Sequence, residues 1–154
     1  MLLNKKSFLN IIDKTPLCSI DILIKVKNKY LFGLRKNRPA KNYYFVPGGR
    51  IFKNENYKLT IKRILKDELG LYIKDIKYKI IGIYNHIYKE NVFSVRKINT
   101  HYFVCAIMIK FQKKIKIKKD NQHDKFILQT KSEALKNKEI HKFSKIYLKD
   151  IDKI

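Results

Sequence analysis

The segment from Gly49 to Leu71, GRIFKNENYKLTIKRILKDELGL, carries the pattern from which the fold of this 154-residue chain follows. Apolar residues recur at helical spacing from about Tyr57 to Leu69, which predicts a helix with one buried face. Asn56 is placed to cap the start of this helix, and Gly70 is placed to end it. Glu68 continues the apolar face, so the pattern puts a carboxylate inside the protein.

A carboxylate at that position is costly to bury unless it is paired or bound to a metal ion. The turn Pro47-Gly48-Gly49 precedes the helix, and its glycines allow a sharp bend with positive φ. Such a bend brings a backbone carbonyl next to Glu68, and hard oxygen ligands of this kind suit Mg2+ beside substrate phosphates. We therefore expect a magnesium site; the alternative for a single helix carboxylate is a solvated or ion-paired residue.

The spacing of the whole segment resembles the Nudix box, G-x5-E-x7-R-E-U-x-E-E-x-G-U, where U is a bulky aliphatic residue. Gly49, Glu55 and Arg63 stand at the matching positions. Two positions depart from the pattern, since Ile64 replaces the Glu after the Arg and Asp67 replaces the first of the paired Glu. We expect Glu55 and Arg63 to form an ion pair that holds the loop to the helix.

Blocks outside the box are similar to those of one Nudix subfamily, the GDP-mannose mannosyl hydrolases. They are Thr15 to Leu17, Asn37 to Ala40, Tyr43 to Arg50, Thr100 to Tyr102 and Gln122 to Asp124, in the family's order. The resemblance implies an α/β (α+β) fold, a Nudix-type α/β/α sandwich with a mixed central β-sheet, in a single domain over residues 1–154. It also implies a homodimer and a role in sugar-nucleotide turnover for cell-surface polysaccharide.

Members of this subfamily hydrolyse a glycosidic bond: water attacks C1 of the sugar and releases GDP with inversion. The resemblance implies this reaction on GDP-mannose or another GDP-hexose, with His123 as the base, a role that suits an imidazole near neutral pH. Arg35 and Arg50 match positions that stabilise the leaving diphosphate, which needs no separate acid once cations neutralise it. The matching ligands of one Mg2+ ion are the Gly48 carbonyl, the Glu68 carboxylate and the Gln122 side-chain oxygen.

Further positions match polar residues around the family's substrate site: Asp21 as a catalytic residue, and Lys36, His86 and Tyr102 as substrate-binding residues. An isolated Asp or Tyr in a strand, or a His in a loop, is also common as a structural group, and that alternative stays open. We interpret His101 and His141 as structural.

Two other functions stay open. Asp67 keeps a second acid beside Glu68, which allows a second metal ion and attack at phosphorus by a pyrophosphatase that yields a nucleoside monophosphate and a sugar 1-phosphate. The weaker alternative is a nucleic-acid-binding module, suggested by 36 Lys and Arg against 13 Asp and Glu and a net charge of +23. These cations are 31 Lys and 5 Arg, beside 24 Ile and 12 Asn, which indicates A/T-rich coding and not a nucleic acid partner. Arg would then be kept mainly where its planar fork matters.

The rest of the chain predicts alternating strands and short helices. We expect helices at Phe8–Ile12, after the capping box Thr130–Glu133, and at Ile140–Ile151. We expect strands at Leu17–Val26, Tyr30–Leu34, Tyr43–Val46, Ile76–Tyr84, Thr100–Phe111, Lys113–Lys119 and Phe126–Leu128.

Cys18 and Cys105 lie in apolar runs and are interpreted as core residues in a reducing compartment. No apolar run approaches the roughly 20 residues of a membrane span, so we expect a cytoplasmic protein without a membrane partner.

Overall fold

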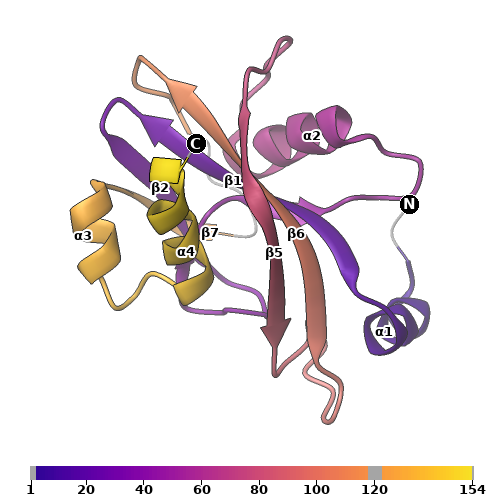
Figure 1. Ribbon diagram of the computed structural model, residues 1–154. Coiled ribbons are helices and arrows are strands. Elements are labelled where there is room, and N and C mark those ends of the chain that lie inside the picture. The colour runs from indigo at the N-terminus through magenta and orange to yellow at the C-terminus, as the bar shows by residue number, and fades with distance from the viewer. Residues whose placement is uncertain (1–2, 118–122, 154) are drawn as a thin grey trace.

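Strand β1 (Leu17–Val26) lies at the centre of the sheet (Figure 1). The structure, a computed structural model, describes residues 3–117 and 123–153. β1 runs parallel to β6 (Thr100–Phe111), from the pair Leu17 and Tyr102 to the pair Val26 and Phe111. The other strand pairs are antiparallel, so the sheet is mixed.

Among the described residues, seven strands form one sheet in the order β3-β2-β1-β6-β5, with β4 paired to β1 and β7 paired to β2. The remaining strands are β2 (Lys29–Arg35), β3 (Tyr44–Phe45), β4 (Gly48–Arg50), β5 (Lys79–Tyr88) and β7 (His123–Gln129). The helices are α1 (Lys5–Lys14), α2 (Tyr57–Leu69), α3 (Lys131–Lys136) and α4 (Lys142–Asp150), and a 3-10 turn, Ile151–Lys153, follows α4.

Helices cover both faces of the sheet, with α2 on one side and α3 and α4 on the other (Figure 1). The face under α2 is built from apolar residues of β1, β6 and the helix: Ile20, Ile22, Ile24, Ile107, Ile61, Ile64, Leu65 and Leu69. The opposite face packs α3 and α4 against the sheet through Leu23, Phe32, Ala134, Phe143, Tyr147 and Leu148. The predicted α/β/α sandwich with a mixed sheet is confirmed.

The ends of α2 and the start of α3 follow their local sequence. The Asn56 side chain accepts a hydrogen bond from the Leu59 N–H at 3.0 Å, which satisfies a free donor of the first turn of α2. Gly70 ends α2 with a left-handed φ of 67°, a conformation that costs glycine no steric strain. Thr130 and Glu133 form the predicted capping box at α3.

Several predicted boundaries are wrong. β5 starts at Lys79 instead of Ile76 and continues to Tyr88, because its ladder with β6 extends to the pair of Tyr88 and Thr100. Residues 113–117 form no strand; Ile115 and Ile117 instead pack against the cluster under α2. Residues 118–119 of that predicted strand lie outside the described residues.

The two cysteines also differ from expectation. Cys18 is exposed and Cys105 is only half-buried, so neither is a core residue. Cys18 stands opposite Phe103, itself 47% exposed, in the β1–β6 ladder, so this pair faces solvent.

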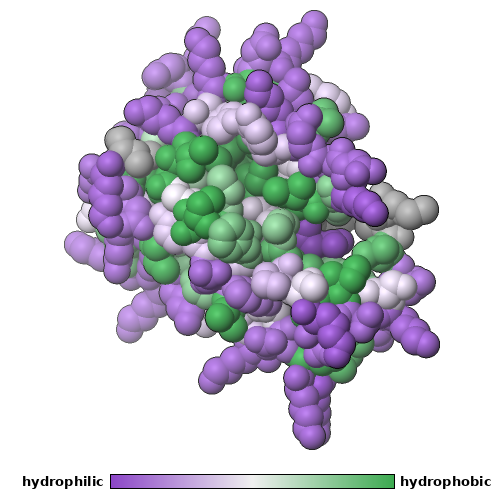
Figure 2. All heavy atoms as spheres, turned by 45° about the vertical axis from the view of Figure 1, so that its right-hand side comes forward, coloured by the Kyte–Doolittle hydropathy of each residue, from purple (hydrophilic) through white to green (hydrophobic). Residues whose placement is uncertain are grey.

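The outer strand β5 leaves apolar side chains in contact with solvent. Ile80, Ile83 and Ile87 are all more than half exposed. Figure 2 shows apolar side chains gathered in the middle of one face, with long polar side chains projecting around it.

Within the described residues, no helix has the length and apolar character to cross a bilayer. The expected dimer and compartment stay predictions.

Candidate active site

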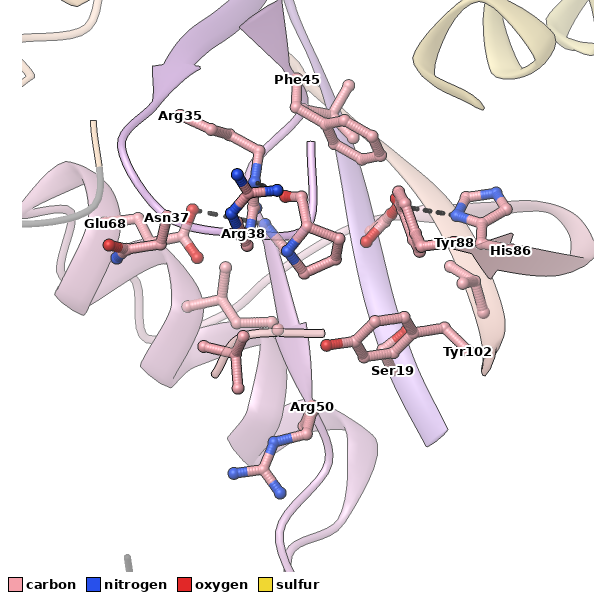
Figure 3. Close-up of a pocket in the computed structure, with 18 of the residues that line it drawn as sticks. Ser19, Arg35, Asn37, Arg38, Phe45, Arg50, Glu68, His86, Tyr88 and Tyr102 are labelled. Carbon is pink, nitrogen blue, oxygen red and sulfur yellow. Dashed lines mark hydrogen bonds and ion pairs between the residues drawn. The ribbon is translucent and has the colours of Figure 1, made fainter. Parts of the chain in front are cut away.

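A cavity of about 370 Å3 is lined by residues of β1, β2, β4, β5 and β6 (Figure 3). The end of α2 and the loop that follows β2, residues 36–43, also contribute to its walls. Its walls include Asp21, Arg35, Arg50, Glu68 and His86, which come from five different elements. A volume of this order suits a small organic ligand. With Gly48 and Tyr102, which also line it, the structure brings seven of the predicted site residues to one cavity.

Arginine is concentrated at this cavity. Four of the five Arg in the chain line it: Arg35, Arg38, Arg50 and Arg63. No Lys of the described part of the chain does so, although Lys provides most of the positive charge. Because the guanidinium fork matches phosphate and carboxylate oxygens in pairs, this distribution favours an anionic ligand.

Arg63 is committed to the predicted ion pair with Glu55. Its Nε lies 2.7 Å from Glu55 Oε1, and its Nη2 lies 2.8 Å from Oε2 and 2.7 Å from the Arg50 carbonyl oxygen. Glu55 also accepts from the Phe52 N–H and the Thr60 hydroxyl. The hydrogen bonds from Arg63 hold the pKa of Glu55 down at about 2. The pair therefore ties the loop after β4 to α2, and the prediction of its structural role is confirmed in geometry.

Arg38 is likewise bound to the side chain of Glu90, whereas Arg35 and Arg50 form no ion pair with a carboxylate in the described part of the chain. Arg35 Nε donates to the Pro39 carbonyl oxygen at 3.0 Å. The guanidinium of Arg50 stacks on the ring of Phe8, 3.9 Å from its centroid. These contacts orient the two side chains and leave their charge for a ligand.

Tyr102 lies close to both of these cations. Burial raises the pKa of its phenol, while the positive charges of Arg35 and Arg50 lower it in part. Burial also lowers the pKa of Arg50. Tyr102 thus adds a neutral hydroxyl to the cationic part of the cavity.

Glu68 is 2% exposed, as the helical pattern predicts. Its Oε2 accepts a hydrogen bond from the Gly48 N–H at 3.3 Å, so the carboxylate and the backbone of β4 lie side by side. The exposed Asp67 also lines the cavity, and the buried Ile64 fills the position where the Nudix box has a Glu. No group of three His, Cys, Asp or Glu side chains suited to a metal occurs in residues 3–117 and 125–153. A buried carboxylate beside a backbone segment still fits a hard cation such as Mg2+.

Gly48 is required by close packing and not by a turn. Neither Gly48 nor Gly49 has the positive φ that their bend was expected to use, and both lie in strand β4 beside β1. A Cβ atom on Gly48 would lie 2.3 Å from Asp21 Oδ1 and 2.9 Å from the Ile20 carbonyl oxygen. The missing side chain lets β4 approach the Asp21 carboxylate.

Asp21 and His86 both line the cavity; Asp21 lies beside Gly48, and His86 lies on the side of the cavity opposite Glu68 (Figure 3). Both are nearly fully buried, and Tyr147 of α4 donates its hydroxyl to Asp21 Oδ2 at 2.6 Å. Burial raises the pKa of Asp21 to about 6, with partial compensation from Tyr147 and Arg35. Burial and the nearby His141 lower the pKa of His86 to about 4. His86 is therefore neutral near pH 7, and the 4.0 Å between its Nδ1 and Asp21 Oδ2 is not an ion pair.

Other predicted site residues lie elsewhere or beyond the described part of the chain. The backbone of His123 pairs with Arg35 in the β2–β7 ladder, whereas its side chain, like the whole of Gln122, lies outside the described residues. Lys36 is half-buried but does not line the cavity. His101 contacts Asn85, and His141 caps α4 by accepting from the Phe143 N–H, so both have the structural contacts expected of them.

Tyr147 and Phe8 are site neighbours that the sequence pattern did not single out. Tyr147 repeats the apolar position of Phe143 one helical turn later, so its spacing is that of a core residue. Its partner Asp21 is 126 residues away in the chain, and no local signal joins them.

Comparisons with known proteins find relatives over part of the chain. No family model matches it. It is 34% identical over 101 residues to the low-salt glycan biosynthesis protein Agl8 of Haloferax volcanii, covering 64% of this chain and 62% of that protein. It is 31% identical over 71 residues to the 8-oxo-dGTP diphosphatase of Buchnera aphidicola, covering 46% and 53%. The chain thus spans less than two thirds of the length of these relatives.

A solved structure with a similar fold is the MutT NUDIX hydrolase from Burkholderia pseudomallei. The TM-score is 0.71, over 90% of this chain and 99% of that one, at 14% sequence identity. At this identity the likeness shows the fold alone.

Proposed function

We propose that this chain is a Nudix-type hydrolase and that it hydrolyses GDP-mannose or a related GDP-hexose; its fold is similar to that of a Nudix hydrolase, and the segment from Gly49 to Leu71 resembles the Nudix box. Water attacks C1 of the sugar, the bond from C1 to the diphosphate oxygen breaks, and the products are GDP and the free sugar with inversion. The relative from Haloferax volcanii is named as a glycan biosynthesis protein, which supports a connection with glycans.

The observation that carries this proposal is that one cavity combines guanidinium groups with hydrogen-bond acceptors. Arg35 and Arg50 offer two guanidinium groups without carboxylate partners among the described residues, and a diphosphate matches them in charge and geometry. Asp21 and the neutral His86 supply hydrogen-bond acceptors, which suit the hydroxyl donors of a sugar. A nucleotide sugar joins these two chemistries in one molecule.

The bond that breaks is inferred from the acids on α2. Ile64 leaves the helix with fewer carboxylates than the Nudix box provides, so fewer metal-bound oxygens are available to direct water at phosphorus. Mg2+ held by Glu68, the Gly48 carbonyl and Gln122 would supply positive charge to the leaving diphosphate. His123, whose backbone stands opposite Arg35, is proposed as the base that takes the proton from the attacking water.

A second candidate is a pyrophosphatase acting on the same class of substrate. Asp67 lines the cavity next to Glu68, which provides a second acid at the helix end. The relative from Buchnera aphidicola is named as a diphosphatase, which supports attack at phosphorus.

Isotope labelling distinguishes the two reactions. The protein is incubated with GDP-mannose and Mg2+ in 18O-labelled water, and the products are examined by mass spectrometry and NMR. We expect the label at C1 of free mannose and none in GDP. Label on a phosphate, with GMP and mannose 1-phosphate as products, would contradict the proposal and favour the pyrophosphatase.

A further inference from the structure

Tyr147 of α4 contacts two residues that line the cavity, Asp21 and His86. Its side chain is completely buried, and its hydroxyl lies 2.6 Å from Asp21 Oδ2 and 3.2 Å from His86 Nε2. A phenol has one proton to donate, and an ionised carboxylate can only accept. The hydroxyl proton therefore goes to Asp21, and the hydroxyl oxygen accepts from His86.

This arrangement determines the tautomer of His86. A neutral imidazole carries one proton, and the contact with Tyr147 requires that proton on Nε2. Nδ1 is then an acceptor, located 4.0 Å from Asp21 Oδ2 beside the cavity that both residues line. The two acceptors form a pair that a donor group of a ligand can approach.

The same helix also fixes the plane of the His86 ring. Phe143 lies one turn before Tyr147 on α4, and its ring is stacked on the imidazole at 3.9 Å between centroids and 3° between planes. Asp21 is restrained as well, because its Oδ1 packs against the backbone at Gly48, where a Cβ atom would come within 2.3 Å. Helix α4 therefore holds the imidazole by its face and by one edge.

We infer that Tyr147 is a positioning residue: its hydroxyl fixes the Asp21 carboxylate and the Nε2-protonated tautomer of His86, so that both present acceptors to the sugar hydroxyls. This inference rests on the proposed function for the identity of the ligand. The hydrogen-bond arrangement itself does not depend on it.

The first test reads the tautomer directly in the full chain without any ligand. The protein is labelled with 15N-histidine, and the ring signals of His86 are assigned by their loss in His86→Gln. We expect the proton on Nε2 in the wild type and a shift toward Nδ1 in Tyr147→Phe, where the hydroxyl acceptor is gone. A proton on Nδ1 in the wild type, or an unchanged tautomer in Tyr147→Phe, would overturn the inference.

Tyr84→Phe is the matched control for this measurement. The hydroxyl of Tyr84 donates to Asp150 Oδ2 at 2.9 Å, so it also links the sheet to α4 through a carboxylate, but it does not line the cavity. We expect the tautomer of His86 to be unchanged in Tyr84→Phe. A tautomer shift of equal size in both variants would mean that anchoring of α4, and not the Tyr147 hydroxyl, sets the proton, and would overturn the inference.

The second test compares ligands with and without the sugar. Binding of GDP-mannose and of GDP is measured by calorimetry for the wild type, Tyr147→Phe and Tyr84→Phe. We expect Tyr147→Phe to bind GDP-mannose about tenfold more weakly and GDP within twofold of the wild type, because GDP lacks the sugar hydroxyls. Equal weakening for both ligands, or no weakening for either, would contradict the role toward the sugar. If the tautomer result holds and wild-type protein binds no GDP-mannose, the proposed function fails and the role of Tyr147 toward His86 stands.

Discussion

Oε2 of Glu68 and the backbone N–H of Gly48 are joined by a hydrogen bond of 3.3 Å, which brings the end of α2 against β4. Both residues are predicted magnesium ligands, one through its carboxylate and the other through its carbonyl. Because the two predicted ligands are adjacent, a substitution of the Glu68 carboxylate is a direct test of the proposed magnesium site.

Glu68→Gln keeps the shape of the side chain and removes its charge. We expect the rate of GDP-mannose hydrolysis to fall by about 100-fold and the Mg2+ concentration for half-maximal activity to rise, because a neutral amide is a weaker ligand for a hard cation. Magnesium titration of activity measures both effects. Asp75→Asn, an exposed acid away from the cavity, serves as the control. An unchanged magnesium requirement would remove Glu68 from the ligand set.

His123→Ala tests the proposed base. We expect turnover to fall by at least about 100-fold, while GDP binding stays the same, because proton transfer is lost and the leaving-group contacts remain. The control is His101→Ala, whose ring contacts Asn85 outside the cavity. Near-normal turnover in His123→Ala would exclude this residue as the base.

Arg50→Lys tests whether the guanidinium shape matters at the cavity. The variant keeps the positive charge but loses the planar fork and the stacking on Phe8. We expect kcat/KM for GDP-mannose to fall by about tenfold or more. Arg96→Lys is the matched control, since Arg96 is the Arg that does not line the cavity. Equal kinetics in the two variants would argue against a diphosphate contact.

The ion pair of Glu55 predicts a pH dependence of stability. Its pKa is about 2 in the folded protein, below the ordinary value of 4.5, so the pair stabilises the fold above about pH 4.5 and loses this contribution as the pH falls toward 2. We expect Glu55→Gln to lower the free energy of unfolding by about 2 kcal/mol at pH 7, with a difference from wild type that shrinks below pH 4.5. Urea unfolding of both proteins at pH 7 and at a pH below 4.5 measures this difference in the free energy of unfolding. The exposed Glu139 provides the control in Glu139→Gln. A difference independent of pH would contradict the assignment.

Gly48→Ala tests the close approach of β4 to Asp21. The added Cβ would lie 2.3 Å from Asp21 Oδ1 and 2.9 Å from a backbone oxygen, so we expect a loss of about 2–3 kcal/mol in the free energy of unfolding. Gly49→Ala is the matched control, because its Cβ would meet Ile64 Cγ1 at 3.4 Å, and we expect a loss below about 1 kcal/mol. Similar losses in both variants would show that the contact at Gly48 is not specific.

Elements whose bounds depend on local interactions could be predicted from the sequence. Helix α2 has the predicted bounds, Tyr57–Leu69, because its caps and its apolar stripe lie within the helix itself. β1 has its predicted bounds because a strand buried on both faces is a continuous apolar run. The end of β5 could not be predicted, since it depends on pairing with β6 across the Asn91 loop.

The pattern from Gly49 to Leu71 was sufficient to place Glu68 in the interior, because the helical period fixes which face of α2 is buried. It was also sufficient to pair Glu55 with Arg63, because these two residues are only eight positions apart. Only the tertiary structure decided that Arg38 and Arg63 join Arg35 and Arg50 at the cavity, which no Lys of residues 3–117 and 123–153 lines, and that Tyr147 meets Asp21 and His86 there. Those contacts join residues 61 to 126 positions apart, whose side chains come together only when α4 packs on the sheet. Periodicity records which face of an element is buried, but it carries no information about which distant side chain that face will meet.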